Sequence, residues 1–479
     1  MSNNLVRRDF IKLSALGAAS LTLPGLSFGS QKKNNASQET GKNKNIISSP
    51  PMGWNSFDSY GVYLHEEAAY KNLEELAKTY LPFGYEYFVI DNGWFGEYDL
   101  IPGTKYPAEK HASDVNINDY GLLQPSKCYF PNGIKPIINR AHKLGLKFGL
   151  HLMRGIPRKA VELNLPIKGT KYRARDIADT NSICRWCSYN YGVDMSRPGA
   201  QEFYNSLVNQ LAEWGVDFIK ADDITGFPKE IIGLANAIEQ NPRDIVFSLS
   251  PGGSTVLYNL PYYKRANMVR ITKDIWDRVD DLDKAFTSWE VFQGTGNEVF
   301  YPDLDMIPFG NLMQMTPAEY YEDNEDAVRL AGHGYKRKSQ FTQSQHYTFI
   351  TIRALGGSPL FIGGDLPTMD NFSQKLLTNK EMIACSQNGV VGFNIYKKDS
   401  FEIWLTPDKK IYGKGWLGIF NRNKMNKIIS LDKNDFKFRD SVNYKIYDVW
   451  NEQEISFNNN KVEFDIPADG VVFLKFQEA

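Results

Sequence analysis

Apolar positions in the middle of the chain repeat one pattern: an amphipathic stretch ends at a glycine, and a short apolar run follows. The glycines are Gly84, Gly145 and Gly215, and the runs after them begin YEYFVI, LKFGLHL and VDFIKA. Glycine readily adopts the left-handed conformation that ends a helix. The pattern therefore predicts helices that alternate with buried strands, an order typical of parallel strands covered by helices.

Candidate strands of this kind occur eight times, at 50–57, 85–94, 146–155, 216–223, 245–253, 267–275, 300–307 and 358–366. Eight strand–helix units that close on themselves form a (β/α)₈ TIM barrel, whose active site lies at the carboxyl ends of the strands. A doubly wound open sheet is the competing arrangement, but it usually carries a glycine-rich phosphate-binding turn, which we do not find. We predict an α/β fold with the barrel over residues 46–384.

The pattern changes after residue 385. The segments SFEIWLT, GWLGIFNRN, YKIYDVW, KVEFDI and GVVFLKF are short alternating strands separated by turns rich in Asn, Asp and Gly. Such spacing indicates an antiparallel β-sandwich, which we predict over residues 385–479. This domain could bind glycan independently or brace the barrel, and we favour bracing.

The N-terminus resembles an export signal. Paired arginines in VRRDFIK precede an apolar run that is too short to span a bilayer comfortably. We predict a twin-arginine-type signal peptide over residues 1–30 and a flexible, polar linker over 31–45. An ordinary N-terminal helix is the alternative. The mature protein is then expected in the periplasm or outside the cell, without membrane association once the signal is removed.

Composition excludes some partners. The chain has 55 basic and 56 acidic residues, so no net field favours nucleic acid or an acidic membrane. Four cysteines include the pair in CRWC at 184–187, but no second pair or nearby histidine completes a zinc site. We predict no metal and no cofactor. A local disulfide and two buried thiols both remain open for this pair, and nothing indicates the oligomeric state.

Charged residues end the strand FIKADD at 218–223. Side chains alternate along a strand, so Lys220 and Asp222 share one face, while Ile219 and Ala221 share the other. The outer face of a barrel strand must meet apolar helices, which suits the second pair. We therefore expect Lys220 and Asp222 to point toward the barrel axis, and Asp223 to cap the following loop.

Other strand ends carry similar groups. Applied to the strand at 267–275, the same alternation turns Arg270 and Asp274 inward. Further polar residues at predicted strand ends are Asp91, His151, Arg154, Asp303 and Asp305. A single Asp at a strand end is often a helix cap or an ion-pair partner. Carboxylates at four or more strand ends indicate a functional rim.

The rim favours glycoside hydrolysis. Of six histidines only His151 stands at a strand end, which argues against a metal hydrolase with several histidine ligands. A glycosidase needs one carboxylate that attacks the sugar or activates water, and a second that protonates the leaving oxygen. Trp54 and Trp94 could pack against a sugar face. The alternative of another class is a non-catalytic carbohydrate-binding barrel, which need not keep both Asp222 and Asp274.

Six segments in order, PPMGWNS, VIDNGW, VDFIKADD, RITKDIWD, YPDLDMIPFG and SPLFIGGDL, together resemble glycoside hydrolase family 27. The resemblance implies a retaining α-galactosidase with a (β/α)₈ barrel and an antiparallel β-domain. It implies Asp222 as nucleophile and Asp274 as acid/base. The sugar-binding positions that it implies are Trp54, Asp91, Lys220, Arg270 and Asp305. His151 stands where relatives often carry Tyr, and we add His151 and Arg154 from the third strand to the predicted site.

The expected reaction is a double displacement on an oligosaccharide or glycoconjugate, with Lys220 keeping Asp222 ionised and Arg270 pointing at the sugar. Three departures leave the sugar open: SLSPGG at the fifth strand end, Asn92 after Asp91, and a basic insertion that follows the third strand. Terminal α-D-galactose is the expected glycone. β-L-Arabinopyranosides, α-N-acetylgalactosaminides and isomaltose units are the alternatives.

Overall fold

The computed structural model describes residues 46–109, 111–252, 254–296, 299–321, 334–439 and 441–479. All of them belong to one compact unit, Gly41–Ala479. The predicted signal and linker at 1–45 lie outside the described residues. Within the described ranges, no helix has both the length and the apolar character needed to cross a membrane.

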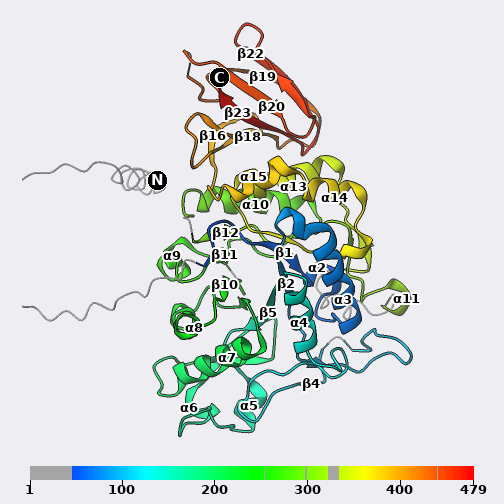
Figure 1. Ribbon diagram of the computed structural model, residues 1–479, viewed down its shortest axis with the longest axis vertical. Helices are drawn as coiled ribbons and strands as arrows, with labels where there is room; N and C mark the ends of the chain where they lie inside the picture. Colours follow the sequence, from blue (N-terminus) through cyan, green and yellow to red (C-terminus); the bar gives the residue numbers. More distant parts are fainter. Residues whose placement is uncertain (1–45, 110, 253, 297–298, 322–333, 440) are drawn as a thin grey trace, which may run out of the picture. The chain divides into compact units, whose positions relative to one another are not determined.

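Eight parallel strands form the central sheet, in the order in which they occur along the chain (Figure 1). They are β1 (Met52–Asn55), β2 (Tyr87–Ile90), β5 (Lys147–Met153), β9 (Phe218–Asp222), β10 (Val246–Leu249), β11 (Met268–Arg270), β12 (Tyr301–Asp303) and β15 (Leu360–Ile362). β1 pairs with β2 on one side and β15 on the other. A parallel bridge between Ile307 and Ile362 then closes the ring. The predicted barrel is confirmed.

Helices surround this ring, and the predicted glycines stand at their ends. The longer helices are α3 (Glu66–Glu75), α4 (Lys135–Lys143), α7 (Ala200–Trp214), α8 (Pro228–Gln240), α10 (Val279–Phe292) and α13 (Gln343–Leu355). Gly84, Gly145 and Gly215 have φ values of 96°, 83° and 102°. These values lie in the left-handed region that glycine adopts without strain, so each glycine turns the chain toward its next strand.

Shorter elements decorate the barrel. The helices are α2 (Phe57–Tyr60), α5 (Arg158–Glu162), α6 (Ala174–Ile177), α9 (Leu260–Tyr263), α11 (Ala318–Tyr321), α14 (Asn371–Leu377) and α15 (Lys380–Gln387). Two small antiparallel pairs join β3 (Gly96–Glu97) with β4 (Asp114–Val115), and β13 (Asn311–Leu312) with β14 (Arg337–Lys338). The basic insertion forms a third antiparallel sheet, with β6 (Ile156–Pro157), β7 (Ala178–Ile183) and β8 (Asn190–Val193). The turn between β7 and β8 carries Trp186.

Side chains inside the barrel follow the predicted alternation. Phe218 joins a separate apolar cluster with Tyr87, Met268 and Phe361, which come from other strands of the ring. Ile219 instead joins the large core shared with the helices. The strand therefore turns Phe218 inward and Ile219 outward, as the sequence predicts.

The C-terminal domain packs two antiparallel sheets against one another. One sheet contains β16 (Phe393–Lys398), β17 (Phe401–Pro407), β18 (Lys414–Asn421), β20 (Tyr444–Asp448), β21 (Gln453–Ile455) and β23 (Val471–Glu478); the other contains β19 (Lys427–Asp432) and β22 (Lys461–Ile466). The predicted β-sandwich is confirmed. Its Trp404 stacks on Trp289 of α10 with 3.8 Å between ring centroids. Both rings belong to the core of the barrel, which favours bracing.

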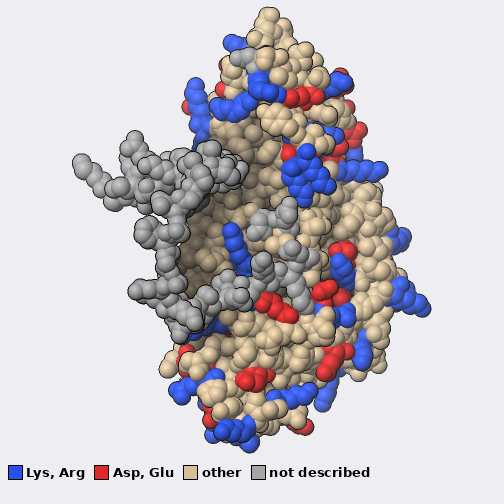
Figure 2. All heavy atoms as spheres, turned by 60° about the vertical axis from the view of Figure 1, so that its left-hand side comes forward, with Lys and Arg blue, Asp and Glu red and all other residues tan. Residues whose placement is uncertain are grey.

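Acidic and basic side chains are interspersed over the face of the molecule shown in Figure 2. This mixture agrees with the balanced composition of the chain.

Candidate active site

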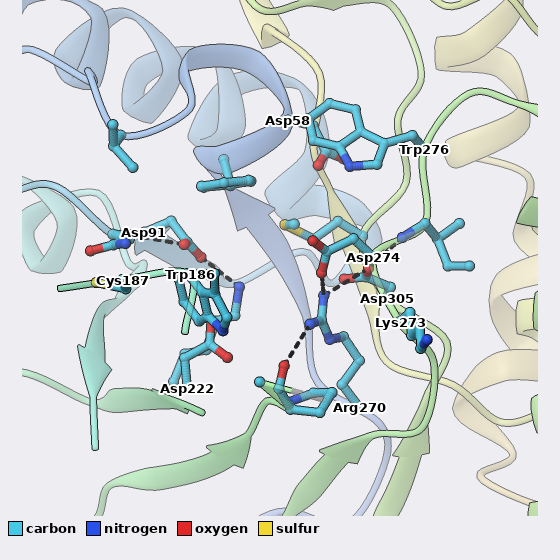
Figure 3. Close-up of a pocket in the computed structure, with 18 of the residues that line it drawn as sticks. Asp58, Asp91, Trp186, Cys187, Asp222, Arg270, Lys273, Asp274, Trp276 and Asp305 are labelled. Atoms are coloured by element: carbon cyan, nitrogen blue, oxygen red, sulfur yellow. Dashed lines mark hydrogen bonds and ion pairs between the residues drawn. The ribbon is translucent and has the colours of Figure 1, made fainter. Parts of the chain in front are cut away.

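A cavity of about 490 Å³ opens at the carboxyl ends of the barrel strands. Its walls come from residues at or just after the ends of β1, β2, β9, β10, β11 and β12, from the turn between β7 and β8, and from His111 between β3 and β4. This is the face at which barrel enzymes carry their chemistry. Figure 3 draws the cavity with Asp222 and Asp274 on its walls. The structure thus brings the two predicted catalytic carboxylates to one site.

Asp222 is the last residue of β9 and is 8% exposed. Its Oδ2 lies 3.1 Å from Nε2 of His151, which comes from the neighbouring strand β5. Burial raises the pKa of Asp222, but the His151 hydrogen bond and the charges of His151, Arg270 and Lys220 outweigh this effect, and the pKa is lowered. Asp222 is therefore held as a carboxylate, the form that can attack a sugar.

Lys220 pairs directly with Asp91 rather than with Asp222. Its Nζ lies 2.7 Å from Oδ2 of Asp91, and Nδ2 of Asn55 donates to the same oxygen at 2.7 Å. Burial raises the pKa of Asp91, but Lys220 and His151 outweigh it and lower that pKa. The charge of Lys220 still helps to keep Asp222 ionised, as expected, but His151 is the direct partner and the larger cause.

Asp274 lies four residues beyond the end of β11, where the rim meets solvent. Its side chain is 51% exposed. Nη1 of Arg270 lies 2.6 Å from Oδ1 of Asp274 and 3.0 Å from Oδ2 of Asp305 (Figure 3). The expectation that Arg270 does not pair with Asp274 is therefore wrong, although Arg270 also lines the cavity. Arg270 ties the two carboxylates together and fixes the loop after β11.

Asp305 also holds the loop after β11 in place. Its Oδ2 also accepts a hydrogen bond from the backbone N–H of Ile275 at 2.9 Å. The backbone of Asp305 has a φ of 75°, a left-handed conformation that is uncommon for a residue other than glycine. Asp91, Lys220, Arg270 and Asp305 all line the cavity, so the structure brings these four predicted sugar-binding residues together.

Trp54 and Trp94 do not reach the cavity. Trp54 is fully buried, its Nε1 donates to the carbonyl of Gly364, and its ring stacks on Phe88. Trp94 is 1% exposed and donates to the carbonyl of His151. The alternation along β1 turns Asn55 inward, and it therefore turns Trp54 toward the helices.

Arg154 and His151 lie behind the cavity wall. Nε of Arg154 lies 3.0 Å from Oδ2 of Asp223, and its Nη1 lies 3.0 Å from Oε1 of Glu230. Arg154 therefore holds the end of β9 in place, and Asp223 is its ion-pair partner instead of the expected loop cap. His151 is fully buried and contacts the predicted nucleophile.

Several cavity residues are missing from the sequence prediction. Among them are Phe57, Asp58, Trp186, Tyr189 and Trp276. Phe57 had a usable signal, because it follows shortly after the end of β1, on the face where barrel enzymes carry their active site. Trp186 had none, because it belongs to an inserted hairpin whose position over the barrel depends on tertiary packing.

All four cysteines are unbridged. Cys184 and Cys187 are buried, and burial raises the pKa of each thiol to about 12. Of the two possibilities left open for CRWC, the structure shows buried thiols. Across the described ranges, no group of three or more His, Cys, Asp and Glu side chains is arranged to hold a metal ion.

A closed (β/α)₈ barrel with two carboxylates in one cavity at its catalytic face is the arrangement of a barrel glycosidase. Family models support this class: the melibiase model matches residues 51–240, and the α-galactosidase A model matches residues 187–388.

Solved structures and curated sequences agree. A family 27 β-L-arabinopyranosidase from Geobacillus stearothermophilus, in complex with arabinose, is 34% identical, with a TM-score of 0.81 over 90% of this chain and 98% of that chain. A Bacillus halodurans protein to which an α-N-acetylgalactosaminidase activity has been ascribed is 31% identical, with a TM-score of 0.76 over 92% and 100% of the two chains. The α-galactosidase of Cyamopsis tetragonoloba is 23% identical over 88% of this chain and 84% of its own. The chain belongs to glycoside hydrolase family 27, and it is an α-galactosidase-like glycosidase.

Proposed function

We propose that this protein releases terminal α-D-galactose from oligosaccharides or glycoconjugates by a retaining double displacement. One observation carries the proposal. A buried carboxylate, Asp222, and a half-exposed one, Asp274, line the same cavity. Their different environments suit different roles, because a nucleophile must stay ionised while an acid/base must exchange protons with water.

In the first step, Asp222 attacks the anomeric carbon and forms a covalent bond to the sugar. The hydrogen bond from His151 holds the carboxylate in one orientation, and the paired Lys220 and Asp91 lie beside it on the same cavity wall. Asp274 donates its proton to the leaving oxygen. The sugar-to-aglycone bond breaks as the new bond forms.

In the second step, water attacks the same carbon and Asp274 takes the proton from it. Its half-exposed side chain gives water access to the site after the leaving group has departed. Arg270 keeps Asp274 at the cavity through their 2.6 Å contact. Two inversions at one carbon return the original configuration, so the sugar leaves with the anomeric form that it had in the substrate.

β-L-Arabinopyranosides are the second candidate substrate class. The observation that favours them is the 34% identity to a β-L-arabinopyranosidase. β-L-Arabinopyranose has the ring configuration of α-D-galactose and lacks only the hydroxymethyl group at C5. The carboxylates and the lysine of the cavity can therefore bind the ring hydroxyls of either sugar.

The leaving group passes Trp186, which is 44% exposed and lines the cavity from the turn between β7 and β8. An exposed indole offers a flat apolar face on which a sugar or aryl ring can stack. We place the aglycone against this ring.

The proposal is tested with nitrophenyl α-galactoside, β-L-arabinopyranoside and α-N-acetylgalactosaminide, and with isomaltose. Asp222→Asn should lower turnover on the best substrate by several orders of magnitude while the circular dichroism spectrum stays unchanged. Asp274→Ala should be partly spared on substrates with good leaving groups, which need little protonation. Asp119→Asn, at an exposed position outside the cavity, is the control.

Near wild-type turnover by Asp222→Asn would exclude it as nucleophile. Equal loss by Asp274→Ala on good and poor leaving groups would count against its acid role. The first anomer released, followed by NMR, reports the stereochemistry directly, and an inverted product would contradict the double displacement.

We also propose that the chain is exported through its twin arginines, so that the enzyme works in the periplasm or outside the cell. The paired Arg7 and Arg8 before a moderate apolar run support this. Replacing both arginines with lysine should retain the enzyme in the cytoplasm, as measured by activity in cell fractions. Unchanged fractionation would refute the export route.

A further inference from the structure

Asp58 is a buried carboxylic acid in the wall of the cavity. It lies on α2, directly after β1, and is 1% exposed. Neither of its carboxyl oxygens has a hydrogen-bond partner among the described residues. A buried polar group without a partner costs free energy, and native proteins contain few such groups. The position of Asp58 therefore needs an explanation.

Three other acids of the cavity show the contrast. Asp91 is paired with Lys220, Asp222 with His151, and Asp305 with Arg270. Each of these three carboxylates is stabilised within the protein itself. Figure 3 draws Asp58 on the wall across the cavity from Asp222, with no dashed line to any neighbour.

The backbone beside Asp58 leaves room for the carboxyl group. A Cβ atom added at Gly363 would lie only 1.9 Å from Oδ2 of Asp58. Any residue other than glycine at 363 would displace the acid. The chain thus accommodates the carboxyl group sterically without satisfying it through hydrogen bonds.

The environment of Asp58 also favours its neutral form. Burial, and then the charge of Asp305, raise its pKa well above the ordinary value, and Lys220 offsets this only in part. A protonated carboxyl group has one O–H donor and a carbonyl acceptor. A sugar hydroxyl is also a donor and an acceptor, so the two groups are complementary.

We propose that Asp58 binds a hydroxyl group of the glycone through its unpartnered carboxyl oxygens and so helps to select the sugar. This inference rests on the proposed function, because it assumes a sugar in the cavity. When the hydrogen-bond partner of a buried polar group is a ligand hydroxyl, a ligand without that hydroxyl binds much more weakly, because the buried group is left unpaired.

The test measures binding separately from catalysis. Galactose and L-arabinose are titrated calorimetrically into the wild type, Asp58→Leu, Asp58→Asn and Ser59→Ala. Asp58→Leu removes both oxygens while keeping the branched shape of the side chain, and Asp58→Asn keeps an acceptor oxygen and N–H donors. Ser59 is a buried neighbour on α2 that does not line the cavity, and its replacement is the matched control. Asp58→Ala replaces the leucine variant if leucine does not fit.

We expect Asp58→Leu to weaken binding of the preferred sugar about tenfold, the effect of one lost hydrogen bond. Asp58→Asn should retain most of the affinity, and Ser59→Ala all of it. The melting temperature of Asp58→Leu should equal or exceed that of the wild type, because no internal partner is lost.

Unchanged sugar affinity in Asp58→Leu or Asp58→Ala would overturn the proposal. So would a fall in melting temperature without a change in affinity, since that pattern belongs to a structural residue. The proposed function fails differently: the wild type would then hydrolyse none of the glycosides, whatever occupies position 58.

Discussion

The hydrogen bond between His151 and Asp222 should control the acid limb of the pH profile. Asp222 must be ionised to attack, so activity is lost as pH falls through its pKa. His151 is the first cause among those that lower this pKa against the effect of burial. In His151→Phe this contribution disappears, while Asp222 stays buried at the end of β9. The acid limb of kcat/KM should therefore move to higher pH.

The size of the shift follows from the contact. A hydrogen bond to an ionised group contributes about 1.5–3 kcal/mol. Since about 1.4 kcal/mol corresponds to one pKa unit, losing the 3.1 Å contact should raise the acid limb by about 1–2 pH units. At pH values well above this limb, kcat/KM of His151→Phe should lie closer to the wild-type value than it does at low pH, because Asp222 is again ionised.

The assay is the pH dependence of kcat/KM on a nitrophenyl glycoside, which reports the free enzyme. His151→Gln is the matched variant, because its side-chain amide can still donate to Asp222, and its acid limb should lie between those of the wild type and His151→Phe. An acid limb that does not move in His151→Phe, in a protein with an unchanged melting temperature, would refute the role assigned to this hydrogen bond.

Three further predictions follow from other contacts. Arg154→Met should lower the free energy of unfolding, measured in urea, by about 3–5 kcal/mol, because it leaves two buried carboxylates without their ion-pair partner. Arg197→Met, at an exposed ion pair, is the control and should change this free energy little. Equal effects of the two replacements would contradict the prediction. Burial raises the pKa of Asp303 from 3.8 to about 6. The folded protein therefore holds a proton on Asp303 that the unfolded chain releases, and the free energy of unfolding should fall by about 3 kcal/mol as pH rises from 4 to 6. Asp303→Asn should flatten this part of the stability profile in urea titrations, and an unchanged slope would exclude Asp303 as its origin. Trp186→Ala should lower kcat/KM about tenfold for aryl glycosides and oligosaccharides but not for the glycosyl fluoride, which has no ring to stack; equal loss on all three would place Trp186 elsewhere.

The barrel could be predicted from sequence because its signals are local. Each strand is a short apolar run, and Gly84, Gly145 and Gly215 take the left-handed conformation that the pattern requires. The same alternation that buries Phe218 brings Lys220 and Asp222 to the axis. These placements depend only on the period of a strand and the closure of the ring.

Beyond the strand ends this reasoning is a weaker guide, although Asp91, Asp274 and Asp305 lie there and do line the cavity. β5 ends at Met153, so alternation does not govern Arg154, which turns behind the wall to Asp223. Lys220 pairs with Asp91 instead of Asp222 because of distances between different strands, and these distances cannot be predicted from the sequence of one strand. Trp54 was predicted to bind sugar from the family resemblance alone. Alternation along β1 turns the neighbouring Asn55 inward, and so it places Trp54 on the outer face of the strand.

The last strand of the chain occupies the middle of a sheet. β23 lies between β18 and β20, and its Phe473 belongs to the same core as Trp54 and Phe88 of the barrel. A polypeptide that stopped before Val471 would therefore leave a gap inside the sandwich and expose apolar side chains that the barrel also uses. A nonsense change just before the codon for Val471 should for this reason be as damaging as a deletion in the catalytic half.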